Sequence, residues 1–251
     1  MKIISIYPDN PKIGFPTTAA WIIVNDPSTG GIKAFMEASY LTAMRTGAIS
    51  GVAAKYLAPR DAKTVAIFGA GAQARTQIWA AATVRNIEQI RVYDPVKTAV
   101  DKFTDDMEKK LGLEIVKASS GEEACKGADI VMTATTSKIP VLNRNWLGDH
   151  VHISAIGAFY PGWREIDTAT IRDSKLVIDE WEAIKQESGD ILIPLAEGAI
   201  NESHIYATLG ELVTGIKTGR TNDDGLTLFK SVGIAIQDNS VANLVLKKLN
   251  S

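Results

Sequence analysis

Two glycines and an alanine, Gly69, Gly71 and Ala74, stand at the spacing G-x-G-x-x-A. They follow an apolar run that predicts a strand over residues 64–68, and they open a predicted helix over residues 72–85. The first glycine permits a tight turn, the second lets the backbone approach a pyrophosphate, and the small alanine lets the helix pack closely on its strand. The helix N-terminus adds N–H groups and a partial positive charge. The pattern therefore predicts a dinucleotide-binding loop.

An acidic residue stands at the end of the next predicted strand. Asp94 directly follows the strand predicted over residues 89–93. Its carboxylate can accept hydrogen bonds from the hydroxyls of an adenosine ribose and would repel a 2′-phosphate, which favours NAD over NADP. An alternative interpretation makes Asp94 the N-cap of the following helix, because Pro95 comes next. Together the two signals predict NAD as the cofactor.

Arg45 lies in a helix predicted from about residue 38 to residue 57, among small and apolar residues. A buried guanidinium needs an anion or several acceptors, so Arg45 could bind a substrate carboxylate or a cofactor phosphate. An ion pair with an acidic side chain, or an exposed position, would explain it equally. Small and hydroxyl-bearing residues at 133–137 and 156–162 end two further predicted strands. They could line a ribose and a nicotinamide, or they could simply form loops.

The elements that must position these residues alternate between strands and helices after residue 60. Strands are predicted at 64–68, 89–93, 113–116, 129–133, 151–156 and 175–178. This alternation predicts right-handed crossovers and an α/β fold, a doubly wound parallel sheet of the Rossmann type. The first segment predicts three strands, at 2–7, 19–24 and 31–35, which form an incomplete sheet on their own.

The composition excludes several classes of function. The 251 residues include 27 Lys and Arg against 29 Asp and Glu, for a net charge of −2, so no broad basic field would attract nucleic acid or a membrane surface. One cysteine, Cys125, and three histidines predict no metal site and no internal disulfide. The sequence contains neither the ~20 apolar residues of a membrane helix nor a signal peptide, which predicts a cytoplasmic protein.

Five stretches, spread from near the first residue to the tail, carry a family resemblance: residues 15–17, 41–46, 69–74, 157–165 and 227–233. In these the sequence resembles the ornithine cyclodeaminase/mu-crystallin family, which includes archaeal-type alanine dehydrogenases. The resemblance implies a Rossmann domain over residues 61–233. It also implies a smaller α+β domain for substrate binding and homodimer formation, here residues 1–60 completed by a C-terminal helix over residues 234–251.

The resemblance further implies which residues lie around the dinucleotide, and it places Arg45 against the substrate carboxylate as well. These residues are Thr17, Arg45, Thr46, Gly69, Gly71, Ala72, Gln73, Ala74, Asp94, Thr135, Gly157, Ser231 and Val232.

Two departures from the family pattern limit the transfer. Phe159 stands where ornithine cyclodeaminases carry an aspartate that receives the substrate's amino group, and a phenyl ring can neither hold an ammonium by charge nor shuttle a proton. In addition, Met1 falls inside the family pattern. The segment that usually precedes this point in the family, with its substrate-binding lysine and arginine, is therefore expected either to lie upstream of Met1 or to be absent from a shortened protein whose substrate pocket is open.

The expected function is an NAD-dependent oxidoreductase that transfers hydride to or from a small amino or imino acid, like an alanine dehydrogenase or a ketimine reductase. Two alternatives stay open. One is an ornithine cyclodeaminase, which releases ammonia from ornithine to form proline. The other is a non-catalytic, crystallin-like protein that holds NAD(H).

Overall fold

The computed structural model describes residues 1–7 and 9–249, which fold into two compact units. Unit 1 comprises Met1–Thr46 and Gly233–Ser251, and unit 2 comprises Gly47–Val232. The division falls inside helix α1 (Ser39–Leu57), whereas the sequence-based boundary was placed after residue 60. The reason is packing, because Ala53, Ala54 and Leu57 of α1 are buried in the cores of unit 2.

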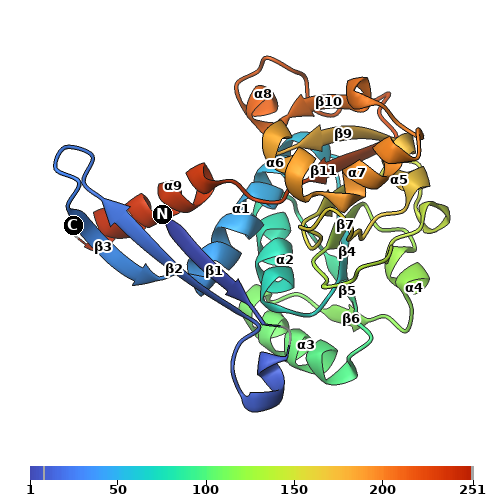
Figure 1. Ribbon diagram of the computed structural model, residues 1–251. Coiled ribbons are helices and arrows are strands. Elements are labelled where there is room, and N and C mark those ends of the chain that lie inside the picture. The colour runs from blue at the N-terminus through green and yellow to red at the C-terminus, as the bar shows by residue number, and fades with distance from the viewer. Residues whose placement is uncertain (8, 250–251) are drawn as a thin grey trace. The chain divides into compact units, whose positions relative to one another are not determined.

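Unit 2 is built on an eight-stranded parallel sheet within the described part of the chain, as the alternating pattern predicts. Its strands are β4 (Thr64–Phe68), β5 (Gln89–Tyr93), β6 (Ile115–Lys117), β7 (Ile130–Thr133), β8 (His152–Ala155), β9 (Ser174–Ile178), β10 (Ile205–Thr208) and β11 (Leu226–Lys230). They lie in the order β10-β9-β11-β8-β7-β4-β5-β6 (Figure 1). From β4 the chain first adds β5 and β6 on one side of the sheet and then continues with β7 and β8 on the other side. β4 therefore lies at the switch point of the sheet, which is where open α/β sheets bind ligands.

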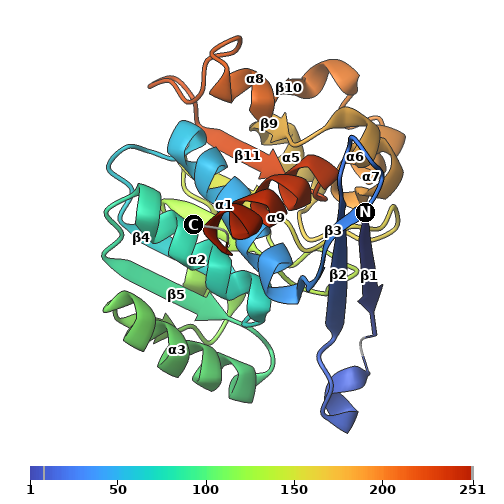
Figure 2. The same cartoon turned by 90° about the vertical axis from the view of Figure 1, so that its left-hand side faces the viewer.

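Helices cover both faces of this sheet, since its strands alternate their side chains between two apolar cores. In β4, Val65 and Ile67 face the second half of α1, α2 (Ala72–Val84) and α3 (Lys97–Leu111), seen in Figure 2. Ala66 and Phe68 face the opposite core. That side is covered by α4 (Gly121–Cys125), α5 (Thr168–Asp173), α6 (Trp181–Glu187) and α7 (Gly189–Ala196).

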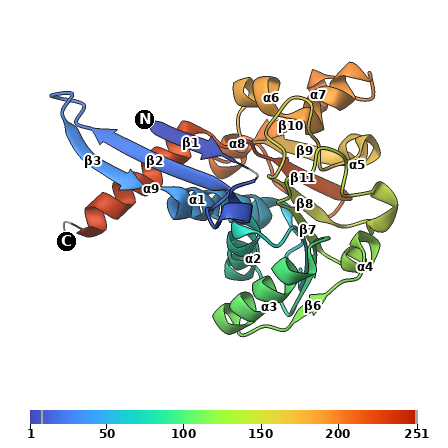
Figure 3. The same cartoon turned by 60° about the horizontal axis from the view of Figure 1, so that its bottom comes forward.

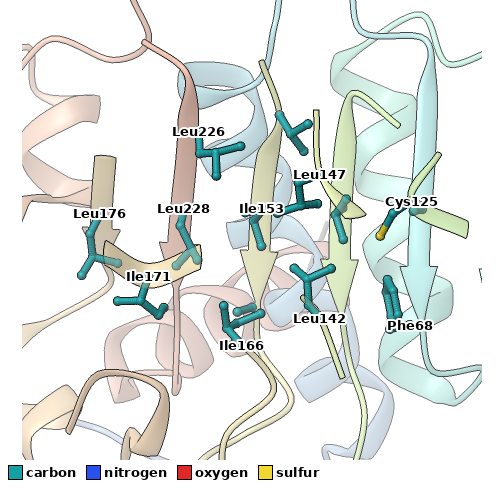
Figure 4. Packing of buried hydrophobic residues seen from close by; sticks show 14 of the residues in the cluster. Phe68, Cys125, Leu142, Leu147, Ile153, Ile166, Ile171, Leu176, Leu226 and Leu228 are labelled. Atoms are coloured by element: carbon teal, nitrogen blue, oxygen red, sulfur yellow. The ribbon is translucent and has the colours of Figure 1, made fainter. Parts of the chain in front are cut away.

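Figure 4 shows the second of these cores, where Cys125, Ile153 and Leu228 come from three different elements but join one apolar layer. The short helix α4 begins after Ser120, whose side chain accepts a hydrogen bond from the Glu123 N–H. Four elements were not predicted from the sequence, namely α5, α7, β10 and α8 (Leu209–Val213). Single turns of 3₁₀ helix occur at Arg144–Trp146 and Glu202–His204.

Unit 1 contains an antiparallel sheet of β1 (Lys2–Ile6), β2 (Thr18–Asn25) and β3 (Ile32–Glu37), with a 3₁₀ turn at Asn10–Ile13. Helix α9 (Ala235–Leu249) packs Ala242 against Ala20 and Ile22 of β2, and Figure 3 shows it running across the sheet. The other face keeps large apolar side chains in solvent, including the stacked rings of Trp21 and Phe35.

Candidate functional site

The loop after β4 has the backbone shape that the glycine spacing predicts. Gly69 has a φ of +94°, and a Cβ at this position would lie 2.6 Å from the carbonyl oxygen of Ala134, so a larger residue is excluded. Gly71 is the N-cap of α2, and the space beside its Cα is open. Ala74 is fully buried against the strand. An open, positively polarised helix N-terminus at this point fits an anionic pyrophosphate.

Asp94 joins this loop to the end of β5. Its Oδ2 accepts a hydrogen bond from the Ala70 N–H at 3.0 Å, and its Oδ1 accepts one from the Val96 N–H at 2.8 Å. The N-cap of α3 is Val96 rather than Asp94. Asp94 is half-buried, and each of its oxygens can accept a further hydrogen bond. A carboxylate held in this way fits the hydroxyls of a ribose.

The ends of three further strands bring more of the predicted residues to the same edge of the sheet. Thr135 follows β7, Gly157 follows β8, and Ser231 and Val232 follow β11. A Cβ at Gly157 would overlap the Glu165 carboxylate and the Thr135 carbonyl, so the backbones after β7 and β8 meet closely.

Asp179, which the sequence analysis missed, organises the end of β11. Its Oδ2 accepts hydrogen bonds from the Ser231 hydroxyl at 2.7 Å and from the Val232 N–H at 3.0 Å. Asp179 directly follows β9, the neighbouring strand in the sheet, and an acidic residue directly after a predicted strand was the available signal.

The remaining predicted residues, Thr17, Arg45 and Thr46, belong to unit 1. Thr17 directly precedes β2, and its carbonyl oxygen accepts a hydrogen bond from the Tyr7 N–H at 2.8 Å. The hydroxyl of Thr46 donates to the Thr42 carbonyl oxygen one turn earlier in α1.

Arg45 lies in a cluster of charged side chains that are nearly buried. Its Nε donates to Asp238 Oδ1 at 3.1 Å, and its Nη1 donates to Gln237 Oε1 at 2.8 Å. The Nζ of Lys2 donates to the same Asp238 oxygen at 3.0 Å. Two cations thus share one carboxylate, which leaves one positive charge in excess among Lys2, Arg45 and Asp238. Such a group can attract a carboxylate ligand.

Lys2 is a functional candidate that the sequence analysis missed. Burial and the positive charge of Arg45 lower the pKa of the Lys2 ammonium, while Asp238 opposes this shift. Lys2 and Asp238 also border a cavity of about 370 Å³, lined otherwise by Met1, Ile22, Ile23, Ala235, Ile236 and Asn239. The sequence carried little signal for it, because the inward position of Lys2 follows from its pairing with buried Ile22 in the structure.

Two other titratable side chains, His152 and Cys125, are buried in surroundings that suit a role in packing. His152 is fully buried between Thr227 and Ser154, and burial lowers its pKa to about 3. Burial raises the pKa of the Cys125 thiol to about 12, so the thiolate nucleophile is suppressed. Over residues 1–7 and 9–249, no group of three or more His, Cys, Asp or Glu side chains could hold a metal ion. No helix in that same span is long and apolar enough to cross a membrane.

The fold and this site define a Rossmann-like protein with a dinucleotide-type loop at the switch point of its sheet. The chain belongs to the ornithine cyclodeaminase/mu-crystallin family, whose sequence profile matches residues 1–251.

Among its relatives is a Delta(1)-pyrroline-2-carboxylate reductase of Bacillus cereus, 38% identical over 99% of this chain and 76% of that protein. A solved structure of the Thermococcus litoralis Delta(1)-pyrroline-2-carboxylate reductase in complex with NADH and L-proline is 50% identical. Its TM-score is 0.96, over 98% of this chain and 76% of that one. An archaeal alanine dehydrogenase dimer with bound NAD is 37% identical, with a TM-score of 0.92, over the same 98% and 76%.

Proposed function

We propose that the protein is an NADH-dependent reductase of a small imino acid, with Delta(1)-pyrroline-2-carboxylate as the first substrate to test and L-proline as its product. The observation that carries the proposal is the loop after β4, which joins the turn at Gly69, the open helix N-terminus at Gly71 and the Asp94 carboxylate. The substrate class is supported by the 50% identical reductase that was solved with NADH and L-proline.

The residues of unit 2 would bind and orient the dinucleotide. The N-terminus of α2 would hold the pyrophosphate, and Asp94 would accept hydrogen bonds from the adenosine ribose and disfavour a 2′-phosphate. When bound, NADH supplies the hydride for the imine carbon.

The residues of unit 1 would recognise the substrate. Arg45 would orient its carboxylate, and Lys2 would give a proton to its nitrogen, since burial and Arg45 lower the pKa of the Lys2 ammonium and so make it a stronger acid. One imine, one hydride and one proton then give one amine and NAD⁺. The carboxylate of Asp238, which pairs with both cations, would offset the repulsion between Lys2 and Arg45.

Reductive amination of pyruvate is the second candidate, because the archaeal alanine dehydrogenase is 37% identical and was solved with bound NAD. Cyclodeamination of ornithine is disfavoured by Phe159. Its ring packs with Tyr160 and Trp163, at centroid distances of 4.9 and 6.1 Å, where the reaction would need a carboxylate.

Steady-state assays separate these functions. The purified chain is given NADH with Delta(1)-pyrroline-2-carboxylate, or with pyruvate and ammonia, and NADH oxidation is followed by absorbance. Ornithine with catalytic NAD is the third reaction, with proline and ammonia as its readouts. We expect the fastest turnover with the cyclic imine. NADH binding without turnover of any substrate would instead support a non-catalytic NAD(H)-binding protein.

We also propose that the protein is a cytoplasmic homodimer. The side chains of Ile3, Trp21 and Phe35 are 50%, 42% and 62% exposed on one face of the sheet in unit 1, and such apolar surface favours association. The similar alanine dehydrogenase is described as a dimer. The single, buried cysteine is in keeping with a reducing compartment. Sedimentation equilibrium should give twice the chain mass, and Trp21→Glu should lower it.

A further inference from the structure

The fully buried carboxylate of Glu165 ties together the ends of two neighbouring strands. Its Oε1 accepts hydrogen bonds from the Thr135 N–H at 2.7 Å and from the Thr135 hydroxyl at 2.8 Å. Its Oε2 accepts from the Thr133 hydroxyl at 2.8 Å and from the Gly157 N–H at 2.6 Å. One side chain thus receives four hydrogen bonds and fixes the backbone after β7 against the backbone after β8.

A buried ion pair between Asp190 and Lys230 holds the backbone of Glu165 itself. The Oδ1 of Asp190 accepts hydrogen bonds from the N–H groups of Glu165 and Ile166, at 2.7 and 2.9 Å. Its Oδ2 lies 2.8 Å from the Nζ of Lys230, which also donates to the Ala158 carbonyl oxygen at 2.6 Å. Glu165, Asp190 and Lys230 are all fully buried, and they come from three separate parts of the chain.

Stability does not explain why these charges are kept. Burial raises the pKa of Glu165, which records the cost of keeping its charge away from water, while the charge of Lys230 and the donated hydrogen bonds oppose this shift. Well-packed apolar residues of similar volume often give equal or greater stability than a buried charged group. Two of the residues that Glu165 holds, however, lie beside the end of β4 and the loop after it, because Thr133 pairs with Phe68 and Thr135 lies next to Gly69. The carbonyl of Ala134, next to Thr135, fills the space beside Gly69.

We propose that Glu165 is a positioning residue for dinucleotide binding, which fixes Thr135 and Gly157 in their binding arrangement before the ligand arrives. The inference rests on the proposed function. Because the two backbone N–H groups already point into the carboxylate, the dinucleotide would meet a rigid edge and would not have to order these loops on binding.

The test is Glu165→Gln, with Thr133→Val as the matched control. An amide can be turned either way, but both orientations set its NH₂ group opposite a backbone N–H, of Thr135 or of Gly157. Thr133→Val removes one hydroxyl donor and leaves both backbone bonds. In titrations followed by NADH fluorescence, we expect the Kd of E165Q for NADH to rise about tenfold or more, and that of T133V to rise much less.

The steady-state readout separates positioning from mere stabilisation. In E165Q we expect the KM for NADH to rise while kcat at saturating NADH changes little. A merely structural role would lower the thermal midpoint and the active fraction and leave the KM unchanged. Wild-type affinity for NADH in folded E165Q would overturn the proposal. Failure of the wild-type chain to bind NADH would instead overturn the proposed function.

A measurement on the wild-type chain covers the case in which E165Q does not fold. Amide hydrogen exchange at Thr135 and Gly157 should be slow without NADH and change little on its addition, whereas the first turn of α2 should gain protection. Fast exchange at Thr135 and Gly157 that slows only with NADH would contradict the inference, since these loops would then be ordered by the ligand.

Discussion

The ammonium of Lys230 lies 2.8 Å from the carboxylate of Asp190, and both side chains are fully excluded from water. Lys230 ends β11 and Asp190 opens α7, so this pair links the middle of the sheet to a helix on its surface. Through Asp190 it also fixes the backbone of Glu165. This ion pair therefore affects both the stability of unit 2 and the backbone arrangement of its candidate site.

Lys230→Met should strongly destabilise the protein, because it leaves the Asp190 carboxylate buried without a counter-ion. We expect a loss of about 3–5 kcal/mol in the free energy of unfolding, measured by urea denaturation. The double variant with Asp190→Asn should recover part of this loss, because the Asn oxygen can still accept from the two N–H groups. If Lys230→Met and the double variant were equally stable, the unpaired charge of Asp190 would not be the cause of the loss.

Asp94→Ser should weaken NADH binding and relax the choice between dinucleotides. A serine oxygen can still accept one local N–H bond, but it removes the charge that would repel a 2′-phosphate. We expect the KM for NADH to rise about tenfold and the KM for NADPH to fall, measured from initial rates with each dinucleotide. The control is Asp101→Asn. Asp101 lies on α3 and forms an exposed ion pair with Lys117 of β6, so this variant should change neither value.

Arg45→Ala should abolish turnover and leave NADH binding weaker but measurable. The variant removes the guanidinium that we assign to the substrate carboxylate, and the loop after β4 stays intact. Fluorescence titration with NADH and steady-state rates on the same preparation give the two values. Retention of wild-type turnover would exclude a role for Arg45 in the reaction.

Turnover should fall as the pH rises through the lowered pKa of Lys2. The proposed role needs the protonated ammonium, and since burial and Arg45 lower that pKa, the loss begins below the ordinary value for lysine, 10.5. A pH profile of kcat with saturating substrate measures it. Lys2→Met should lower kcat and remove this limb of the profile, and an unchanged limb in that variant would assign it to another group.

The stability of the protein should fall between pH 6.5 and about pH 3, because His152 binds a proton in the unfolded chain but not in the folded one. Its pKa is lowered from 6.5 to about 3, so the unfolded state carries more protons in this window and the free energy of unfolding rises with pH. The slope from this group reaches about 1.4 kcal/mol per pH unit. His152→Gln should reduce the slope measured by urea unfolding at several pH values.

Much of the fold follows from local patterns in the sequence. The apolar run over residues 64–68, the glycines after it and Asp94 at the end of the next strand predict the dinucleotide-type loop without any knowledge of long-range contacts. Residues 113–116 were predicted as a strand that the structure has at Ile115–Lys117, because such short runs have weak ends. The short elements α5, β10 and α8 carry too few residues for a clear period.

The charged clusters depended on contacts that no local pattern contains. Local patterns account for the class of fold, the loop after β4 and the place of Asp94, since turn geometry and strand alternation depend on neighbouring residues. The insertion of β11 between β8 and β9, which brings Lys230 to Asp190, follows from the packed fold. The same holds for the contact of Asp238 of α9 with Lys2 and Arg45. A buried charge is stabilised by the opposite charge that the packed chain brings within hydrogen-bonding distance, and Asp238 is more than 190 positions away from both Lys2 and Arg45 in the sequence.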